Sequence, residues 1–184
     1  MSKFVKVMFG NKGANYEYKI DEVNIADNWN PSAKNGRDFG GFNYTTEDCI
    51  LRWLHRGDTI YDVEVPEDAE IVKIEGATTI YRTNQIIVKN PRKVTDEMAL
   101  SFYKIANIPE KSYQKALAAI ALMGYEKTAK AILNDKVSKD NVNEFLEEWN
   151  SFFFDGGDGK RKNSGGLITD IYNKLLEIKN DQIK

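Results

Sequence analysis

The hydrophobic pattern changes its period at Thr95, and no other feature of the chain constrains its fold as strongly. Before Thr95, short apolar runs are separated by Gly, Pro and Asn residues, as in a sheet with tight turns. The segment Tyr61-Asp62-Val63-Glu64-Val65 alternates strictly, which places Tyr61, Val63 and Val65 on one buried face of a strand. After Thr95, apolar residues recur at helical spacing. We therefore predict an α+β fold: a small mixed or antiparallel sheet with one or two helices, followed by a C-terminal helical bundle.

The N-terminal region also contains one helix-start pattern among its strand-like runs. The segment Thr45-Thr46-Glu47-Asp48 combines a hydroxyl cap with acids in the first turn, which is typical of a helix N-terminus. We expect this helix to run to Arg56 and to end at Gly57 in the left-handed conformation. Further strands are expected over residues 4–9, 15–23, 71–74 and 79–88.

The chain beyond Thr95 divides by composition. Helical patterns begin near Asp96, Pro109, Glu126 and Asn141, and a Gly-rich stretch with the composition of a flexible linker follows them. The apolar residues between Leu167 and Ile178 then form one stripe of a helix, which docks either on its own chain or on a second copy. The expected organisation is an α+β domain over residues 1–94, a helical domain over 95–155, a flexible linker over 156–166 and an amphipathic C-terminal helix over 167–184.

Composition excludes several classes of protein. The single cysteine, Cys49, and the single histidine, His55, rule out an internal disulfide and a His/Cys metal cluster within one chain, so we expect no metal site. The net charge of -2 gives no basic stripe, so direct nucleic-acid binding is not expected. No apolar run is long enough to cross a membrane, and the N-terminal residues contain no apolar signal core. We expect a cytoplasmic protein without membrane contact.

Acidic residues dominate the segment from Asp62 to Glu75, where Lys73 is the single base. An acidic strand edge can imitate phosphate groups or meet a basic partner surface. It can equally be an edge strand whose charges prevent aggregation. Under the first interpretation, the candidate partner-binding residues are Asp62, Glu64, Glu67, Asp68 and Glu70.

Three segments resemble an uncharacterised family whose members occur in bacterial, phage and giant-virus genomes. They are Gly40-Gly41-Phe42-Asn43-Tyr44-Thr45-Thr46, Tyr61-Asp62-Val63-Glu64-Val65-Pro66 and Arg82-Thr83-Asn84-Gln85-Ile86-Ile87-Val88. The resemblance covers about half of the chain, from Tyr16 to Pro91. It implies an accessory protein of phage or mobile-element type, acting in the cytoplasm of a bacterial host cell.

The order of elements is also similar to that of an ADP-ribosyltransferase. This resemblance implies NAD as cofactor, with Tyr44, Thr45 and Thr46 on the strand that lines the nicotinamide pocket. Asn84 or Gln85 stands where the family has its catalytic acid, and a neutral amide cannot stabilise the oxocarbenium-like centre as a carboxylate does. The polar run that includes Arg82 interrupts a strand and can line a pocket. The candidate cofactor-binding residues are therefore Tyr44, Thr45, Thr46, Arg82, Asn84 and Gln85.

Three functions follow from these patterns. The first is a protein that binds a host protein and inhibits a defence system such as CRISPR by acidic surface mimicry. The alternative is an NAD-dependent ADP-ribosyltransferase-like enzyme, which is degenerate unless an acid such as Glu64 or Glu75 replaces the missing one. The third is a structural protein that forms a homo-oligomer through Leu167–Ile178. No cofactor is certain, and no catalytic residue is identified.

Overall fold

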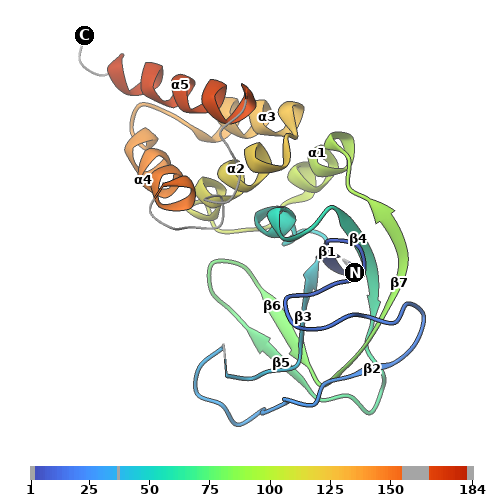
Figure 1. Cartoon of the computed structure of the whole chain (residues 1–184). Helices are drawn as coiled ribbons and strands as arrows, with labels where there is room; N and C mark the ends of the chain where they lie inside the picture. Colours follow the sequence, from blue (N-terminus) through green and yellow to red (C-terminus); the bar gives the residue numbers. More distant parts are fainter. Residues whose placement is uncertain (1–2, 37, 155–165, 182–184) are drawn as a thin grey trace. The chain divides into compact units, whose positions relative to one another are not determined.

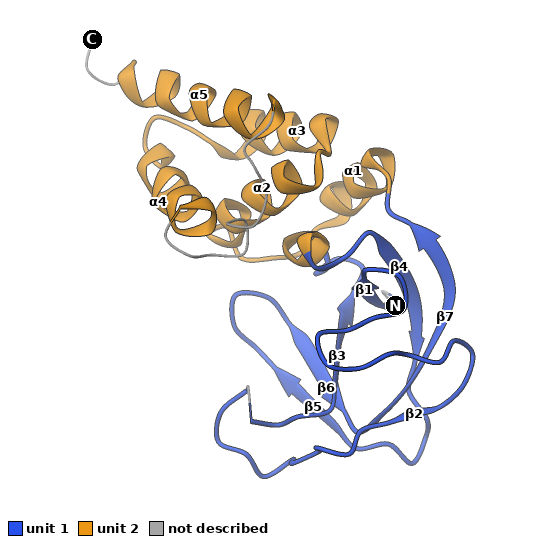
Figure 2. Ribbon diagram, viewed as in Figure 1, with its two compact units in different colours: residues 1–50, 56–94 blue, residues 51–55, 95–184 orange. Residues whose placement is uncertain are grey.

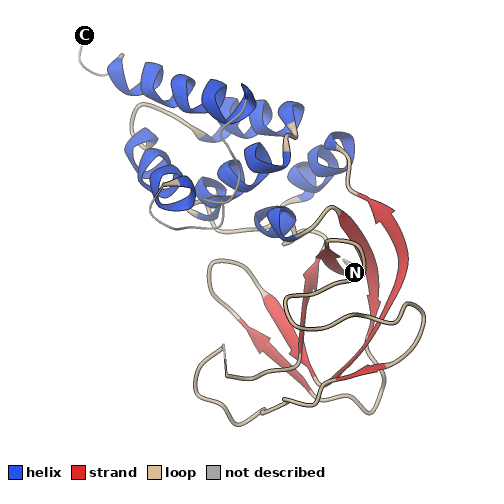
Figure 3. Ribbon diagram, in the orientation of Figure 1, coloured by secondary structure: helices blue, strands red, loops and turns tan. Residues whose placement is uncertain are grey.

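The computed structural model describes residues 3–36, 38–154 and 166–181. The chain forms two compact units (Figure 2): unit 1 comprises Met1–Ile50 and Arg56–Val94, and unit 2 comprises Leu51–His55 and Thr95–Lys184. The fold is α+β, because the described strands lie in unit 1 and the described α-helices in unit 2 (Figure 3). Apart from Gly166, the predicted linker over residues 156–166 lies outside the described residues.

The described residues of unit 1 form a curled seven-stranded sheet (Figure 1). Its strands are β1 (Phe4–Met8), β2 (Asn24–Ile25), β3 (Phe42–Thr46), β4 (Thr59–Glu64), β5 (Ile71–Ile74), β6 (Ile80–Thr83) and β7 (Gln85–Lys93). Neighbouring strands pair antiparallel in the order β2-β7-β4-β1-β3-β6-β5. The sheet curls so far that residues beside its two terminal strands, Ala26 after β2 and Glu70 before β5, both bond to the backbone of Asn84.

An aromatic-rich core fills the concave side of the sheet. Its buried members are Met8, Tyr18, Phe42, Tyr44, Tyr61, Ile86 and Val88. Val63 and Val65 pack against this cluster together with Tyr61, so the face predicted from their alternation is confirmed. Burial of each large apolar side chain stabilises the fold by about 1.5–3 kcal/mol, so this cluster contributes substantially to the stability of unit 1.

The predicted helix start at Thr45 and Thr46 is wrong. Both threonines belong to β3, and the buried Thr45 hydroxyl donates a 2.6 Å hydrogen bond to the carbonyl of Thr79. The helix that follows is a short 3-10 helix, η1 (Leu51–Arg56), and Gly57 after it is extended rather than left-handed. Pairing of Thr45 with Val5 in the sheet overrides the local preference of threonine for a helix cap.

Unit 2 is built from α-helices around its own apolar core. The helices are α1 (Asp96–Ile105), α2 (Ser112–Met123), α3 (Glu126–Lys136), α4 (Val142–Phe153) and α5 (Gly166–Asn180). Helix α5 packs against α2, α3 and α4, and it buries Ile168, Ile171 and Leu175. At these three positions the predicted apolar stripe is covered by its own chain. None of the described helices is both long and apolar enough to cross a membrane.

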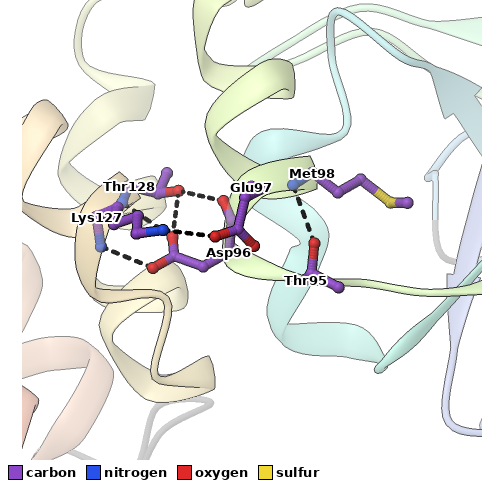
Figure 4. Close-up of polar contacts among 6 residues, drawn as sticks. All are labelled: Thr95, Asp96, Glu97, Met98, Lys127 and Thr128. Atoms are coloured by element: carbon purple, nitrogen blue, oxygen red, sulfur yellow. Dashed lines mark hydrogen bonds and ion pairs between the residues drawn. The ribbon is translucent and has the colours of Figure 1, made fainter.

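A carboxylate of α1 caps the N-terminus of α3 (Figure 4). Asp96 accepts hydrogen bonds from the backbone N–H groups of Lys127 (2.7 Å) and Thr128 (3.0 Å), and from the Thr128 hydroxyl (2.8 Å). The Thr95 hydroxyl caps α1 itself by accepting from the backbone N–H of Met98 at 3.2 Å. The predicted helix start at Thr95–Asp96 is thus confirmed, and the acid also holds two helices together.

Replacement of Asp96 is expected to destabilise unit 2. Asp96→Ala leaves two helix N–H groups without their acceptor, whereas the Thr128 hydroxyl keeps the backbone carbonyl of residue 96 at 3.1 Å, and the free energy of unfolding should fall by about 1–3 kcal/mol. Asp96→Asn retains one acceptor oxygen, so its free energy of unfolding should fall by a smaller amount. Urea unfolding followed through the buried Trp149 of α4 measures the difference, with the exposed Asp140→Ala as control. Equal stability of Asp96→Ala and Asp140→Ala would contradict the capping role.

Candidate functional site

Asn84 ties the two ends of the curled sheet together. It lies between β6 and β7, and its side-chain oxygen accepts a 2.9 Å hydrogen bond from the backbone N–H of Glu70 beside β5. Its carbonyl accepts a 2.9 Å bond from the N–H of Ala26 beside β2, and its own N–H donates to the Glu70 carbonyl at 3.4 Å. The next residue, Gln85, pairs with Ile25 in the ladder between β7 and β2. The side-chain amide of Asn84 therefore has a structural role in holding the segment before β5, and its backbone carbonyl holds the segment after β2.

Two exposed isoleucines lie at this joint. Ile25 precedes Ala26 and is 61% exposed, and Ile71 follows Glu70 and is 51% exposed. They are the two most exposed large apolar side chains in the described part of unit 1. The two most exposed apolar side chains of this unit thus lie on its two terminal strands, each next in sequence to a residue bonded to Asn84.

Acidic residues precede Ile71 in the chain. Glu67 and Asp68 lie exposed in the turn between β4 and β5, which the bond from the Ala69 N–H to the Pro66 carbonyl closes at 3.1 Å. With the described residues, neither acid makes a hydrogen bond or ion pair. Glu70 accepts a 2.8 Å hydrogen bond from the indole N–H of Trp29. We name the set Ile25, Glu67, Asp68, Glu70 and Ile71 the joint surface.

The other two candidate partner-binding acids do not lie on an edge strand. Asp62 and Glu64 belong to β4, which runs between β1 and β7, so the prediction of an acidic edge is wrong for them. Cations of β7 lie beside both: Arg92 pairs with Asp62, and the Lys89 ammonium lies 2.5 Å from a Glu64 oxygen. Local sequence could not show this neutralisation, because it depends on the register between two strands.

A buried lysine lies in the interior of unit 1. The Lys6 ammonium donates to the carbonyl and to the side-chain oxygen of Asn43, both at 2.6 Å, and lies 5.2 Å from the centroid of the Tyr18 ring. Burial, and in second place the cation of Arg82, lower the pKa of Lys6 to about 7. Sequence reasoning missed this residue, because a lysine between two valines is typical of a strand with a solvent-facing side.

Arg82 lines a hollow on the surface of β5 and β6. Ile80 and Arg82 point to the same side of β6, and Ile74 of β5 lies opposite Ile80. With Asn35, Gly36 and Asp38, these side chains surround a volume of about 490 Å³, which we name the Arg82 hollow. The Arg82 guanidinium donates a 2.9 Å hydrogen bond to the Gly40 carbonyl, and its burial lowers its pKa.

The candidate NAD residues Tyr44, Thr45, Thr46 and Arg82 lie on the paired strands β3 and β6, and Asn84 and Gln85 follow Arg82 in the chain. Tyr44 is 3% exposed and stacks on Tyr81, with ring centroids 5.3 Å apart; burial raises the pKa of Tyr44 to about 12. Thr45 is buried against Thr79, and Thr46 ends β3. Of the six residues, only Arg82 lines the hollow. Among the described residues, no group of His, Cys, Asp and Glu side chains could hold a metal ion.

Comparisons with protein-family models, with curated proteins and with solved structures give no match. The joint surface and the Arg82 hollow are therefore the observations from which function is argued.

Proposed function

We propose that the chain is an accessory protein of phage or mobile-element type that binds a protein of the bacterial host cell through the joint surface. The observation behind this proposal is that Ile25 and Ile71, each more than half exposed, are each next in sequence to a residue bonded to Asn84. Exposed apolar side chains with a polar rim are typical of protein–protein contact sites.

The charge of the joint surface defines the chemistry of its partner. Glu67 and Asp68 have no cation beside them among the described residues, so a partner gains most by presenting lysines and arginines around an apolar spot. Proteins that bind nucleic acid have basic surfaces of this kind. A host defence protein that targets nucleic acid is therefore the partner class we propose, with Glu67, Asp68 and Glu70 in the place of phosphate groups. Asp62 and Glu64 contribute little, because β7 already supplies their cations.

Site-directed photo-crosslinking tests the proposal. A photoreactive benzoyl-phenylalanine replaces Ile71, and the full chain is irradiated in a bacterial lysate. The matched control carries the same group at Ile105 of unit 2, which is 52% exposed against 51% for Ile71. We expect a discrete cross-linked host protein from position 71 and none from position 105.

Charge reversal at the same surface separates specific from nonspecific capture. Glu67→Lys and Asp68→Lys are each expected to reduce the yield from position 71 by about tenfold, because like charges would then face each other. Glu17→Lys changes an exposed acid outside the joint surface and should leave the yield unchanged. Equal yields from positions 71 and 105, or a yield that is insensitive to Glu67→Lys and Asp68→Lys, would overturn the proposal.

A further inference from the structure

The Arg82 hollow is an open depression with apolar and polar sides. Its volume of about 490 Å³ is large enough for a small ligand. One wall is apolar, because Ile74 and Ile80 face each other across the ladder between β5 and β6. The opposite side is polar and comes from Asn35 and Asp38, whose side chains are hydrogen-bonded at 3.2 Å.

The guanidinium of Arg82 lacks a counter-charge. Among the described residues, no carboxylate pairs with it, its sole hydrogen bond goes to the Gly40 carbonyl, and its buried Nε has no partner. A second cation, Lys6, lies near enough for Arg82 to lower the pKa of its ammonium. Two partly or fully buried cations without an acid between them are costly to the fold, and an anionic ligand relieves that cost.

We propose that the Arg82 hollow binds a small organic carboxylate with an apolar body. The planar guanidinium matches a carboxylate with two parallel hydrogen bonds, and the isoleucine wall accommodates an alkyl or aryl group. Asp38 on the rim repels additional negative charge, so a singly charged carboxylate is favoured over a doubly charged phosphate. The site shares no residue with the joint surface and does not depend on the proposed function.

Methyl NMR titration of the full chain tests this site. The probes are hexanoate, acetate and inorganic phosphate, followed through the methyl signals of Ile74 and Ile80. Hexanoate is expected to shift both signals and to bind about tenfold more tightly than acetate, since its additional methylenes contact the isoleucines. Phosphate is expected to bind more weakly than hexanoate.

Variants distinguish this site from nonspecific binding. Arg82→Gln is expected to weaken hexanoate binding by about tenfold or more. The control Arg92→Gln, which removes a guanidinium paired with Asp62, should leave hexanoate binding unchanged. The methyl spectrum without ligand shows whether Arg82→Gln is folded. Asp38→Asn removes the negative rim and is expected to strengthen phosphate binding several-fold. Binding of hexanoate that is equal in wild type and folded Arg82→Gln, or no advantage of hexanoate over acetate, would overturn the assignment.

Discussion

Raising the pH from about 7 to about 9 is expected to stabilise unit 1 by about 2 kcal/mol relative to a Lys6→Met variant. The pKa of Lys6 is about 7 in the folded protein, against about 10.4 in an unfolded chain. Between these values the unfolded chain binds a proton that the folded chain does not, so the free energy of unfolding rises with pH. The slope is about 1.4 kcal/mol per pH unit, and the gain ends above the unfolded pKa, where both states are neutral.

Urea unfolding at the two pH values measures this gain. The methyl signals of Ile60 and Ile86, both fully buried in unit 1, report on that unit alone. Lys6→Met retains every other titrating group, so subtraction isolates the contribution of the ammonium. The control Lys12→Met replaces an exposed lysine, and it should show the same gain in stability with pH as wild type. If the difference in free energy of unfolding between wild type and Lys6→Met is the same at both pH values, Lys6 has an ordinary pKa and its ammonium is not buried.

Gly40→Ala is expected to destabilise unit 1 by more than about 3 kcal/mol. Gly40 has a φ of +62°, and a Cβ there would lie 1.8 Å from the carbonyl oxygen of Asn28. This oxygen cannot easily move away, because the Asn28 side chain also accepts a 3.0 Å hydrogen bond from the N–H of Gly41. Backbone strain and steric overlap therefore act together.

Gly10→Ala is the matched control for Gly40→Ala. Gly10 has nearly the same φ, +58°, but a Cβ there has no neighbour within 4 Å. Gly10→Ala should lower the free energy of unfolding only by the cost of placing alanine in the left-handed conformation, about 1–2 kcal/mol. Urea unfolding of the two variants compares the effects, and equal losses would show that Asn28 does not confine Gly40.

Local sequence signals predicted much of the fold. Strict alternation identified the buried face of β4, and a threonine cap followed by acids identified the start of α1. The same kind of signal failed at Thr45 and Thr46, because their strand partner Val5 is distant in the sequence. Capping preferences act over a single turn, whereas strand pairing depends on the whole sheet.

The candidate sites were less predictable than the fold. The polar run around Arg82 pointed to a pocket, and Arg82 does line a hollow, but Ile74 and Asp38, which help to complete it, come from other segments. No local pattern places both Ile25 and Ile71 beside residues bonded to Asn84, because the bonds of Asn84 to Ala26 and Glu70 form only when the sheet curls. The NAD-dependent and oligomerising alternatives stay predictions from the sequence.

The affinity of the host protein that cross-links from position 71 tests the central claim, that the joint surface is the partner-binding site. Its Kd is measured for wild type, Ile71→Arg and Ile105→Arg at low and moderate salt. We expect Ile71→Arg to raise the Kd by about tenfold or more, Ile105→Arg to leave it unchanged, and wild-type affinity to fall as salt rises. A Kd that is equal for the two arginine variants and indifferent to salt would contradict a partner-binding role of the joint surface.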